Sequence, residues 1–169
     1  KADLEAYSAL FPRANQRIIS RLRNVTKSRE YFRIVHRALE SAYIYRHVAW
    51  ANIGQVISGE TVAEMADYIL SCERISWSLA VGYTKNRLFL SMRSTSSQAR
   101  CSRVIHSVAD SFSGIVGGHN QFAGGFIFLK PEDNPDAMAA EIMRRFARQV
   151  LRIPQSADDP VGTLLVEKP

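Results

Sequence analysis

A glycine-rich segment with a single histidine is the part of the sequence that most directly suggests chemistry. It reads Gly117-Gly118-His119-Asn120-Gln121-Phe122-Ala123-Gly124-Gly125. Glycine lets the backbone turn sharply and lets a ligand approach the main chain closely, and a histidine held in such a turn can donate a hydrogen bond to a phosphate oxygen. We therefore predict an oxyanion site in a turn that leads into a strand at residues 126–129, although glycine pairs also serve as simple tight turns.

A second candidate lies about 25 residues earlier, at the end of a strand-like run. Side chains alternate between the two faces of a strand, so Ser91 and Arg93 should project together beside the hydroxyl-rich loop 94–97. A guanidinium next to several hydroxyl groups is suitable for holding phosphate. The alternative is a surface arginine beside a Ser/Thr turn.

The composition is that of a globular protein with a basic surface. The 169 residues carry a formal net charge of +6, mostly from arginine, which holds phosphate bidentately where lysine offers a point charge. This balance favours an anionic partner such as a nucleotide or nucleic acid, or else only a basic surface. Two distant cysteines indicate a reducing cytoplasm. No apolar run approaches the roughly 20 residues that span a bilayer, so no membrane partner is expected.

The elements that must position these candidates begin with a helical leader. Pro12 interrupts the chain near its start. Helices are then predicted over residues 18–25, where apolar side chains recur at helical spacing, and over residues 28–42. We expect residues 1–45 to form a helical connector.

Residues 46–152 are predicted to form a mixed α/β domain, in which a mixed β-sheet is packed with helices. Strand patterns occupy residues 47–53, 75–83, 87–93 and 126–129. The short polar link 84–86 predicts a hairpin between the second and third of these strands.

Helix patterns fall between the predicted strands. Thr61 and Glu64 have the spacing of a capping box and are predicted to open a helix. Residues 99–112 form a second helix pattern, and Asn134 before a proline predicts the start of a third. The last 17 residues, 153–169, are polar and proline-containing, so we expect a loosely ordered tail.

The two candidate motifs, in this order and spacing, resemble the C-terminal associated domain of the DHH (Asp-His-His) phosphoesterases. Ser91-Met92-Arg93-Ser94 is followed by a helix, then by Gly-Gly-His-x-x-Ala-Gly-Gly and a strand. The resemblance covers roughly residues 46–150. The helical leader looks like the connector of the oligoribonuclease and phosphoadenosine-phosphate phosphatase branch. A related domain also occurs in alanyl-tRNA synthetases.

This resemblance implies a substrate-binding role for the domain. In similar proteins an N-terminal catalytic domain holds two metal ions, usually manganese, and hydrolyses a phosphoester, while the C-terminal domain closes over the substrate. The residues implied for substrate or phosphate binding are Ser91, Arg93, Ser94, Gly117, Gly118, His119, Asn120, Ala123, Gly124 and Gly125. The implied partners are that catalytic domain and short RNA, other single-stranded nucleic acid or nucleotide phosphates.

Two departures from the family pattern concern the pocket. Ile115 and Val116 stand where the family usually continues its glycine run, and Phe122 replaces a small residue. We expect a narrower pocket, or a Phe122 ring that stacks on a base.

We expect no catalytic and no metal-binding residues in this chain. It contains no Asp-His-His triplet, no G-x-S-x-G elbow and no P-loop, and its four histidines are scattered. The prediction is the substrate-binding half of a manganese-dependent phosphoesterase that acts on short oligonucleotides or phosphorylated nucleotides. The alternative is a nucleic-acid-binding module without catalysis.

Overall fold

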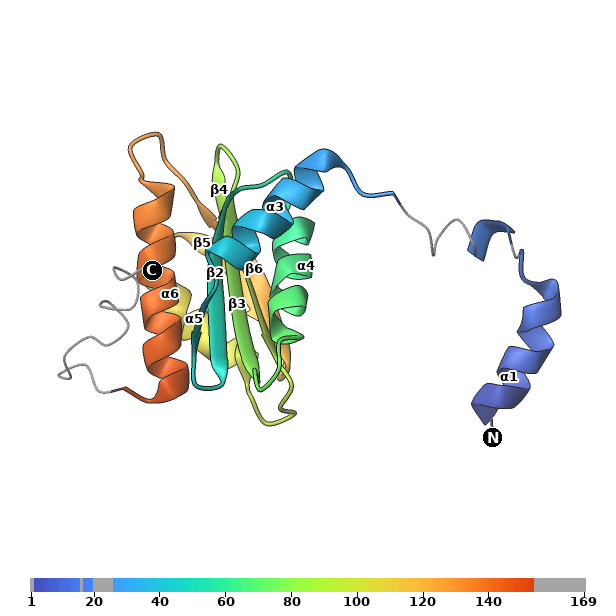
Figure 1. Cartoon of the computed structure of the whole chain (residues 1–169). Helices are drawn as coiled ribbons and strands as arrows, with labels where there is room; N and C mark the ends of the chain where they lie inside the picture. Colours follow the sequence, from blue (N-terminus) through green and yellow to red (C-terminus); the bar gives the residue numbers. More distant parts are fainter. Residues whose placement is uncertain (1, 16, 20–25, 154–169) are drawn as a thin grey trace. The chain divides into compact units, whose positions relative to one another are not determined.

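The computed structural model describes residues 2–15, 17–19 and 26–153 (Figure 1). The chain forms two compact units, Lys1–Phe32 and Arg33–Pro169. The first unit contains helix α1 (Ala2–Leu10) and the 3-10 turn η1 (Phe11–Arg13). The helix predicted over residues 18–25 lies largely outside the described residues, as does the tail predicted at 153–169, beyond its first residue.

The second unit has the predicted α/β architecture. Helix α3 (Arg29–Glu40) crosses the boundary between the units. The remaining elements are β1 (Tyr43–Tyr45), β2 (Val48–Gln55), α4 (Gly59–Leu70), β3 (Trp77–Tyr83), β4 (Arg87–Ser94), α5 (Cys101–Ala109), β5 (Gly114–Gly118), β6 (Phe122–Phe128) and α6 (Pro135–Leu151). Among the described residues, no helix has the length and apolar content that a membrane span requires.

The strands form one six-stranded sheet in the order β1-β2-β3-β4-β6-β5. Only β2 and β3 are parallel, because α4 connects them as a crossover; the other neighbours are antiparallel. Helix α4 packs on one face of the sheet, and α5 and α6 pack on the other (Figure 1). The predicted hairpin between β3 and β4 is confirmed.

The main core lies between the sheet and the α5–α6 layer. Alternate residues of the strands point toward these helices, and both helices present apolar stripes to them. Its largest fully buried side chains include Trp50, Leu79, Leu88, Leu90, Met92, Ile105, Ile127, Ile142 and Phe146. Packing in this core holds the strands in register and so fixes where the side chains on the opposite face of the sheet lie.

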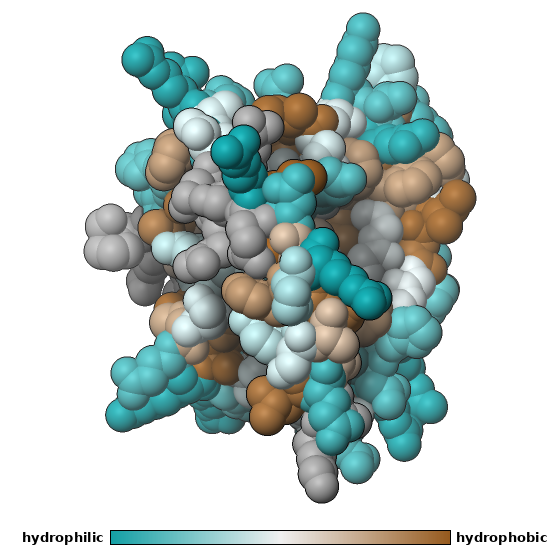
Figure 2. All heavy atoms as spheres, turned by 90° about the vertical axis from the view of Figure 1, so that its right-hand side faces the viewer, coloured by the Kyte–Doolittle hydropathy of each residue, from teal (hydrophilic) through white to brown (hydrophobic). Residues whose placement is uncertain are grey.

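The opposite face of the sheet is covered only in part. Small residues of β2 and β3, including Ala49, Ala51 and Ala80, lie buried where α4 packs close to the sheet. Toward β6 and β5 the face emerges from beneath α4, and Ile115 and Phe122 are exposed. Figure 2 shows apolar and charged side chains interspersed on the surface that it presents.

The glycine-rich segment differs from the predicted turn. It is a β-hairpin, because residues 114–118 form β5, residues 122–128 form β6 and only residues 119–121 make the loop. The glycines therefore lie mostly within strands, and β6 begins four residues earlier than predicted. Glycine has a low propensity for strands, so the sequence pattern did not indicate a strand at residues 114–118. The pairing of β5 with β6 stabilises that strand.

Other element boundaries also needed correction. The predicted capping box at Thr61 and Glu64 is wrong, because α4 already begins at Gly59 after Ser58. Strand β1 was not predicted, since it has three residues and follows the end of α3 directly. The start of α6 is confirmed: the side chain of Asn134 accepts hydrogen bonds from the first backbone N–H groups of the helix.

Candidate phosphate-binding site

Three adjacent strands bring the two sequence motifs together. Ser91 of β4 pairs with Gly124 of β6, which pairs in turn with Gly117 of β5. Arg93 pairs with Phe122 one step further toward the hairpin loop. Paired residues on neighbouring strands point to the same face of a sheet, as do residues two positions apart on one strand. These five residues therefore all lie on the sheet face that α4 leaves partly open.

A groove of about 440 Å³ lies over this part of the sheet. Its lining combines residues of α4, β4 and both strands of the hairpin. Of the residues predicted from the sequence, it contains Ser91, Arg93, Gly117, Gly118, His119, Ala123, Gly124 and Gly125. The groove thus joins motifs about 25 residues apart in the chain, and no Asp or Glu is among its described lining residues.

The glycines of the hairpin have two different roles. A Cβ added to Gly117 would meet no atom within 4 Å, and one added to Gly124 would meet only backbone of β4, at 3.1 Å or more, and the Ser91 hydroxyl. A Cβ on Gly118 would lie 2.4 Å from the backbone of Ala123, and one on Gly125 would lie 2.1 Å from the carbonyl oxygen of Ile115. Gly117 and Gly124 therefore leave the floor of the groove without side chains. Gly118 and Gly125 instead allow β5 and β6 to approach each other closely.

Arg93 supplies the permanent positive charge of the groove. Its Nε donates to Oδ1 of Asp67 at 2.7 Å, and its Nη1 donates to Oγ of Ser91 at 2.8 Å and to the carbonyl of Met92 at 3.0 Å. Within the part of the chain that the structure describes, Nη2 has no hydrogen-bond partner. The side chain is only 19% exposed, so the guanidinium is held in place with one nitrogen available to a ligand.

His119 lies at the end of the hairpin, beside the exposed ring of Phe122. The two rings meet edge to face, with centroids 5.2 Å apart. The backbone N–H of His119 donates to the carbonyl of Phe122 at 2.7 Å, which fixes the start of the loop. The imidazole makes no hydrogen bond to any described residue and is exposed, so both ring nitrogens can reach a ligand.

Two of the predicted residues do not line this groove. Ser94 is buried, and its hydroxyl donates to the carbonyl of Ser76 at 2.8 Å and accepts from the N–H of Ser96 at 3.2 Å. Asn120 lines an adjacent hollow of about 370 Å³ with His119 and Ser102. Ser94 therefore orders the loop after β4, and its expected contact with phosphate finds no support in this geometry.

The start of α5 is also occupied by the hairpin. The carbonyls of His119 and Asn120 accept hydrogen bonds from the backbone N–H groups of Ser102 and Cys101, at 3.0 and 2.9 Å. These are the groups that a helix terminus would otherwise offer to an anion. The hairpin itself is thereby anchored to a helix of the core.

Sequence reasoning missed two contributors. Asp67, on α4, is 26 residues from Arg93, and nothing in the local sequence signals the ion pair between them. Phe89 lines the groove and packs over Gly59, where an added Cβ would lie 2.6 Å from its ring. The strand alternation that placed Ser91 and Arg93 on one face could have identified Phe89 as well.

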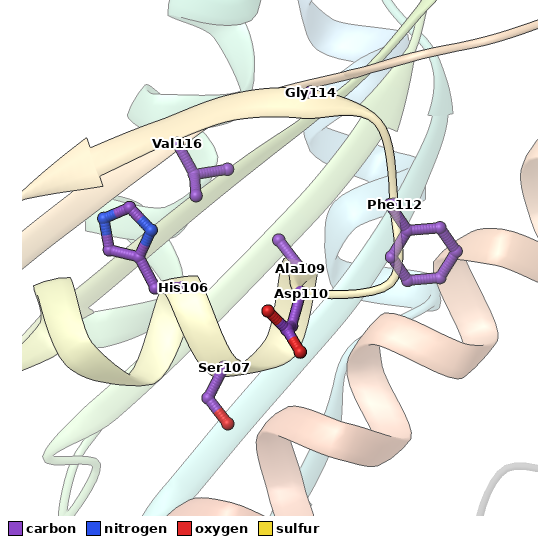
Figure 3. Close-up of a pocket in the computed structure, with 7 residues that line it drawn as sticks. All are labelled: His106, Ser107, Ala109, Asp110, Phe112, Gly114 and Val116. Carbon is purple, nitrogen blue, oxygen red and sulfur yellow. The ribbon is translucent and has the colours of Figure 1, made fainter.

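A different hollow, of about 310 Å³, lies between α5 and β5 (Figure 3). His106 points toward Val116, while the hydroxyl of Ser107 points to the other side of α5. Neither side chain hydrogen-bonds to the nearby Asp110 in the described structure. This hollow therefore contains no serine–histidine–aspartate arrangement. Within the described residues, no group of three or more His, Cys, Asp or Glu side chains could hold a metal ion.

The comparisons with known proteins show a shared fold. No protein-family model matches the chain, and neither does any curated protein sequence. A crystal structure of an exopolyphosphatase-related protein from Bacteroides fragilis is similar over 85% of this chain, with 17% identity and a TM-score of 0.59. The chain spans 42% of the length of that protein.

Two further solved structures are more distant. The C-Ala domain of alanyl-tRNA synthetase from Aquifex aeolicus matches 60% of this chain and 95% of its own length, with 13% identity and a TM-score of 0.46. A pGpG-specific phosphodiesterase from Vibrio cholerae matches 70% of this chain and 39% of its own length, with 13% identity and a TM-score of 0.41.

Proposed function

We propose that this chain is the substrate-binding part of a DHH-type phosphoesterase and that the groove at Arg93 and His119 holds a substrate phosphate. The observation that carries the proposal is the convergence of both sequence motifs on one groove. The fold shared with an exopolyphosphatase-related protein supports it. We place the protein in the cytoplasm and its substrate among short oligonucleotides and phosphorylated nucleotides, as in the oligoribonuclease and phosphoadenosine-phosphate phosphatase branch.

Each groove residue has a binding role that follows from its geometry. Nη2 of Arg93 donates to a phosphate oxygen, while Asp67 and Ser91 hold the guanidinium in position. An imidazole N–H of His119 donates to the same phosphate or to its neighbour. The bare floor at Gly117 and Gly124 leaves room for the substrate backbone, and the half-exposed ring of Phe122 stacks on a base.

Hydrolysis of a phosphoester in this proposal takes place in a separate catalytic domain. Two manganese ions in a separate catalytic domain would supply the activated water and stabilise developing charge. We assign substrate positioning to the groove residues of this chain, because Arg93 and His119 each offer a hydrogen-bond donor to a phosphate. A nucleic-acid-binding module without catalysis is the second candidate, and the basic charge of the chain favours it equally.

Binding of adenosine 3′,5′-bisphosphate, measured by isothermal titration calorimetry, tests the proposed site. Arg93→Lys removes the planar donor, and His119→Ala removes the ring donor. Each should weaken binding by about 1–3 kcal/mol, or about 5- to 150-fold. Lys85→Arg, in the link between β3 and β4 at the other end of the sheet, is the control and should bind normally. Unchanged affinity in both groove variants would refute the site.

Hydrolysis assays separate the two candidate functions. The purified chain, incubated with manganese and a dinucleotide, should show no turnover above buffer. Activity should appear when a catalytic domain of the Asp-His-His type is part of the same protein. Turnover by this chain alone would contradict the assignment of substrate positioning, and the absence of any such domain from the gene would favour the binding module.

A further inference from the structure

A second groove, of about 680 Å³, is lined by arginines and shares no residue with the groove at Arg93. It lies among the turn between β1 and β2, the loop that precedes α5, the first turn of α5 and the end of α6. Its arginines, which define what we call the arginine groove, are Arg46, Arg100, Arg103 and Arg152. No Asp or Glu is among its described lining residues.

Three of these guanidinium groups have no partner in the described structure. The side chains of Arg100, Arg103 and Arg152 make no hydrogen bond or ion pair with any described residue. Other arginines of α6 are different, because Arg144 and Arg145 both contact the carboxylate of Glu141. The arginine groove therefore concentrates positive charge that the described residues leave uncompensated, and binding an anion would relieve the repulsion within it.

The backbone also places arginine at unusual positions around this groove. Arg46, Arg100 and Arg152 have φ angles of 55°, 54° and 55°, in the left-handed region where glycine or asparagine is the common choice. Arg74, outside the groove, shares this conformation. Arginine at three such positions carries a conformational cost that glycine would avoid.

The shape and lining of the groove favour an extended polyanion over a compact one. The four arginines come from three segments around a hollow, which the side chains of Gln98 and Gln149 also line. Trp77 also lines the groove, but it is only partly exposed and its ring packs against Phe146 with centroids 6.3 Å apart. A chain of phosphates can contact several arginines at once. The only exposed ring among the described lining residues is the imidazole of His47, on which a base can stack without sequence preference.

We propose that the arginine groove binds the phosphodiester backbone of single-stranded nucleic acid, with little dependence on base sequence. The neutralisation of phosphates by arginine releases counterions, so the affinity should fall steeply with salt. The proposal does not depend on the function assigned to Arg93 and His119. A strand that occupied both grooves would pass the hairpin loop, because the carbonyl of His119 contacts α5 at Ser102, the residue before Arg103.

The test uses fluorescence anisotropy with the full chain and a fluorescein-labelled 12-nucleotide oligouridylate. The double variant Arg100→Gln/Arg103→Gln removes two unpaired charges. It should bind about tenfold more weakly, and the slope of log affinity against log salt should become shallower by about 1.4, or about 0.7 for each lost contact. The control Lys85→Gln/Lys130→Gln removes the same net charge from the opposite end of the sheet. At about 0.15 M salt and above, where steering over such distances is largely screened, it should retain both affinity and slope.

Two further measurements identify the site and the ligand. Adenosine 3′,5′-bisphosphate should bind the arginine-groove variant with the affinity of the parent, since its proposed site is at Arg93. This measurement tests the groove at Arg93 separately from the arginine groove. Vesicles that contain phosphatidylserine are the second probe. The proposal is overturned if the arginine-groove variant and the control bind the 12-mer equally. It is overturned also if that variant loses vesicle binding but keeps its affinity for the 12-mer.

Discussion

At the scale of single residues, the decisive property of Arg93 is that its contacts are made before any ligand arrives. An arginine held by Asp67 and Ser91 loses little side-chain entropy on binding phosphate. The same contacts make it a poor candidate for replacement by lysine, whose single ammonium cannot bond Asp67, Ser91 and a ligand in this planar arrangement. Its geometry, more than its charge, defines the groove.

Cys101 provides a prediction about reactivity. It is buried at the start of α5, and burial raises the pKa of its thiol from an ordinary value of 9.0 to about 11, against smaller lowering influences from its own backbone and Arg93. The thiolate is the reactive form. At pH 8, iodoacetamide should therefore alkylate the exposed Cys72 and leave Cys101 unmodified in the native protein, as measured by mass spectrometry of peptides.

The same shift predicts how stability depends on pH. Because the folded-state pKa lies above the unfolded-state value, Cys101 contributes its full stability below about pH 9 and loses it as the pH rises toward about 11. The Cys101→Ala variant has no thiol at this position to ionise. Its urea-denaturation midpoint should therefore fall less than that of the parent between about pH 9 and pH 11. Equal alkylation of both cysteines at pH 8 would show that Cys101 is accessible and remove the basis for both expectations.

At the scale of elements, the β5–β6 hairpin combines two requirements in one short sequence. Gly125 has no room for a side chain because of the carbonyl of Ile115, whereas Gly117 faces open space. Gly125→Ala should lower the free energy of unfolding by about 1–3 kcal/mol, the usual cost of forcing atoms into a packed position. Gly117→Ala should change it by less than about 0.5 kcal/mol. Urea denaturation measures both.

Ligand binding should show the reverse order for the hairpin. Gly117→Val places a branched side chain on the groove floor and should weaken binding of adenosine 3′,5′-bisphosphate while the protein stays folded. A stable Gly125→Ala variant would instead show that the strands can separate without cost. Normal binding by Gly117→Val would show that ligand does not use the floor.

The sequence predicted some of these elements well and others poorly, for physical reasons. The face shared by Ser91 and Arg93 followed from strand alternation, which holds because β4 is paired without interruption to β3 on one side and β6 on the other. Strand β5 was missed because its composition, rich in glycine, resembles a turn; only pairing with β6 reveals it. Asp67 was missed because its contact with Arg93 depends on how α4 crosses the sheet, and no local pattern encodes that packing.

At the scale of the whole molecule, the net charge of +6 should steer anions toward the protein. Lys85→Glu lowers that charge by two at the end of the sheet opposite Arg93. The association rate of the labelled 12-mer should fall about two- to threefold at 20 mM salt, and its dissociation rate should stay unchanged, since steering acts over distance while contacts control dissociation. Stopped-flow anisotropy measures both rates.

Salt provides the control for this expectation. At about 0.5 M salt the screening length is only a few ångströms, so the parent and Lys85→Glu should associate equally fast. A change in dissociation rate would mean that Lys85 touches the nucleic acid directly, and a difference that persists at high salt would exclude long-range steering as its cause.

The two carbonyls of the hairpin loop that hold the first turn of α5 have a consequence for motion. The amide protons of Cys101 and Ser102 are shielded by bonds to the loop that carries His119. They can exchange with solvent only when that loop or the helix end opens. A ligand that tightens the loop would slow this opening, and the protection would extend into the helix that presents Arg103. Because these two hydrogen bonds connect the hairpin loop to α5, we expect a ligand in the groove at Arg93 to slow amide exchange at Cys101 and Ser102.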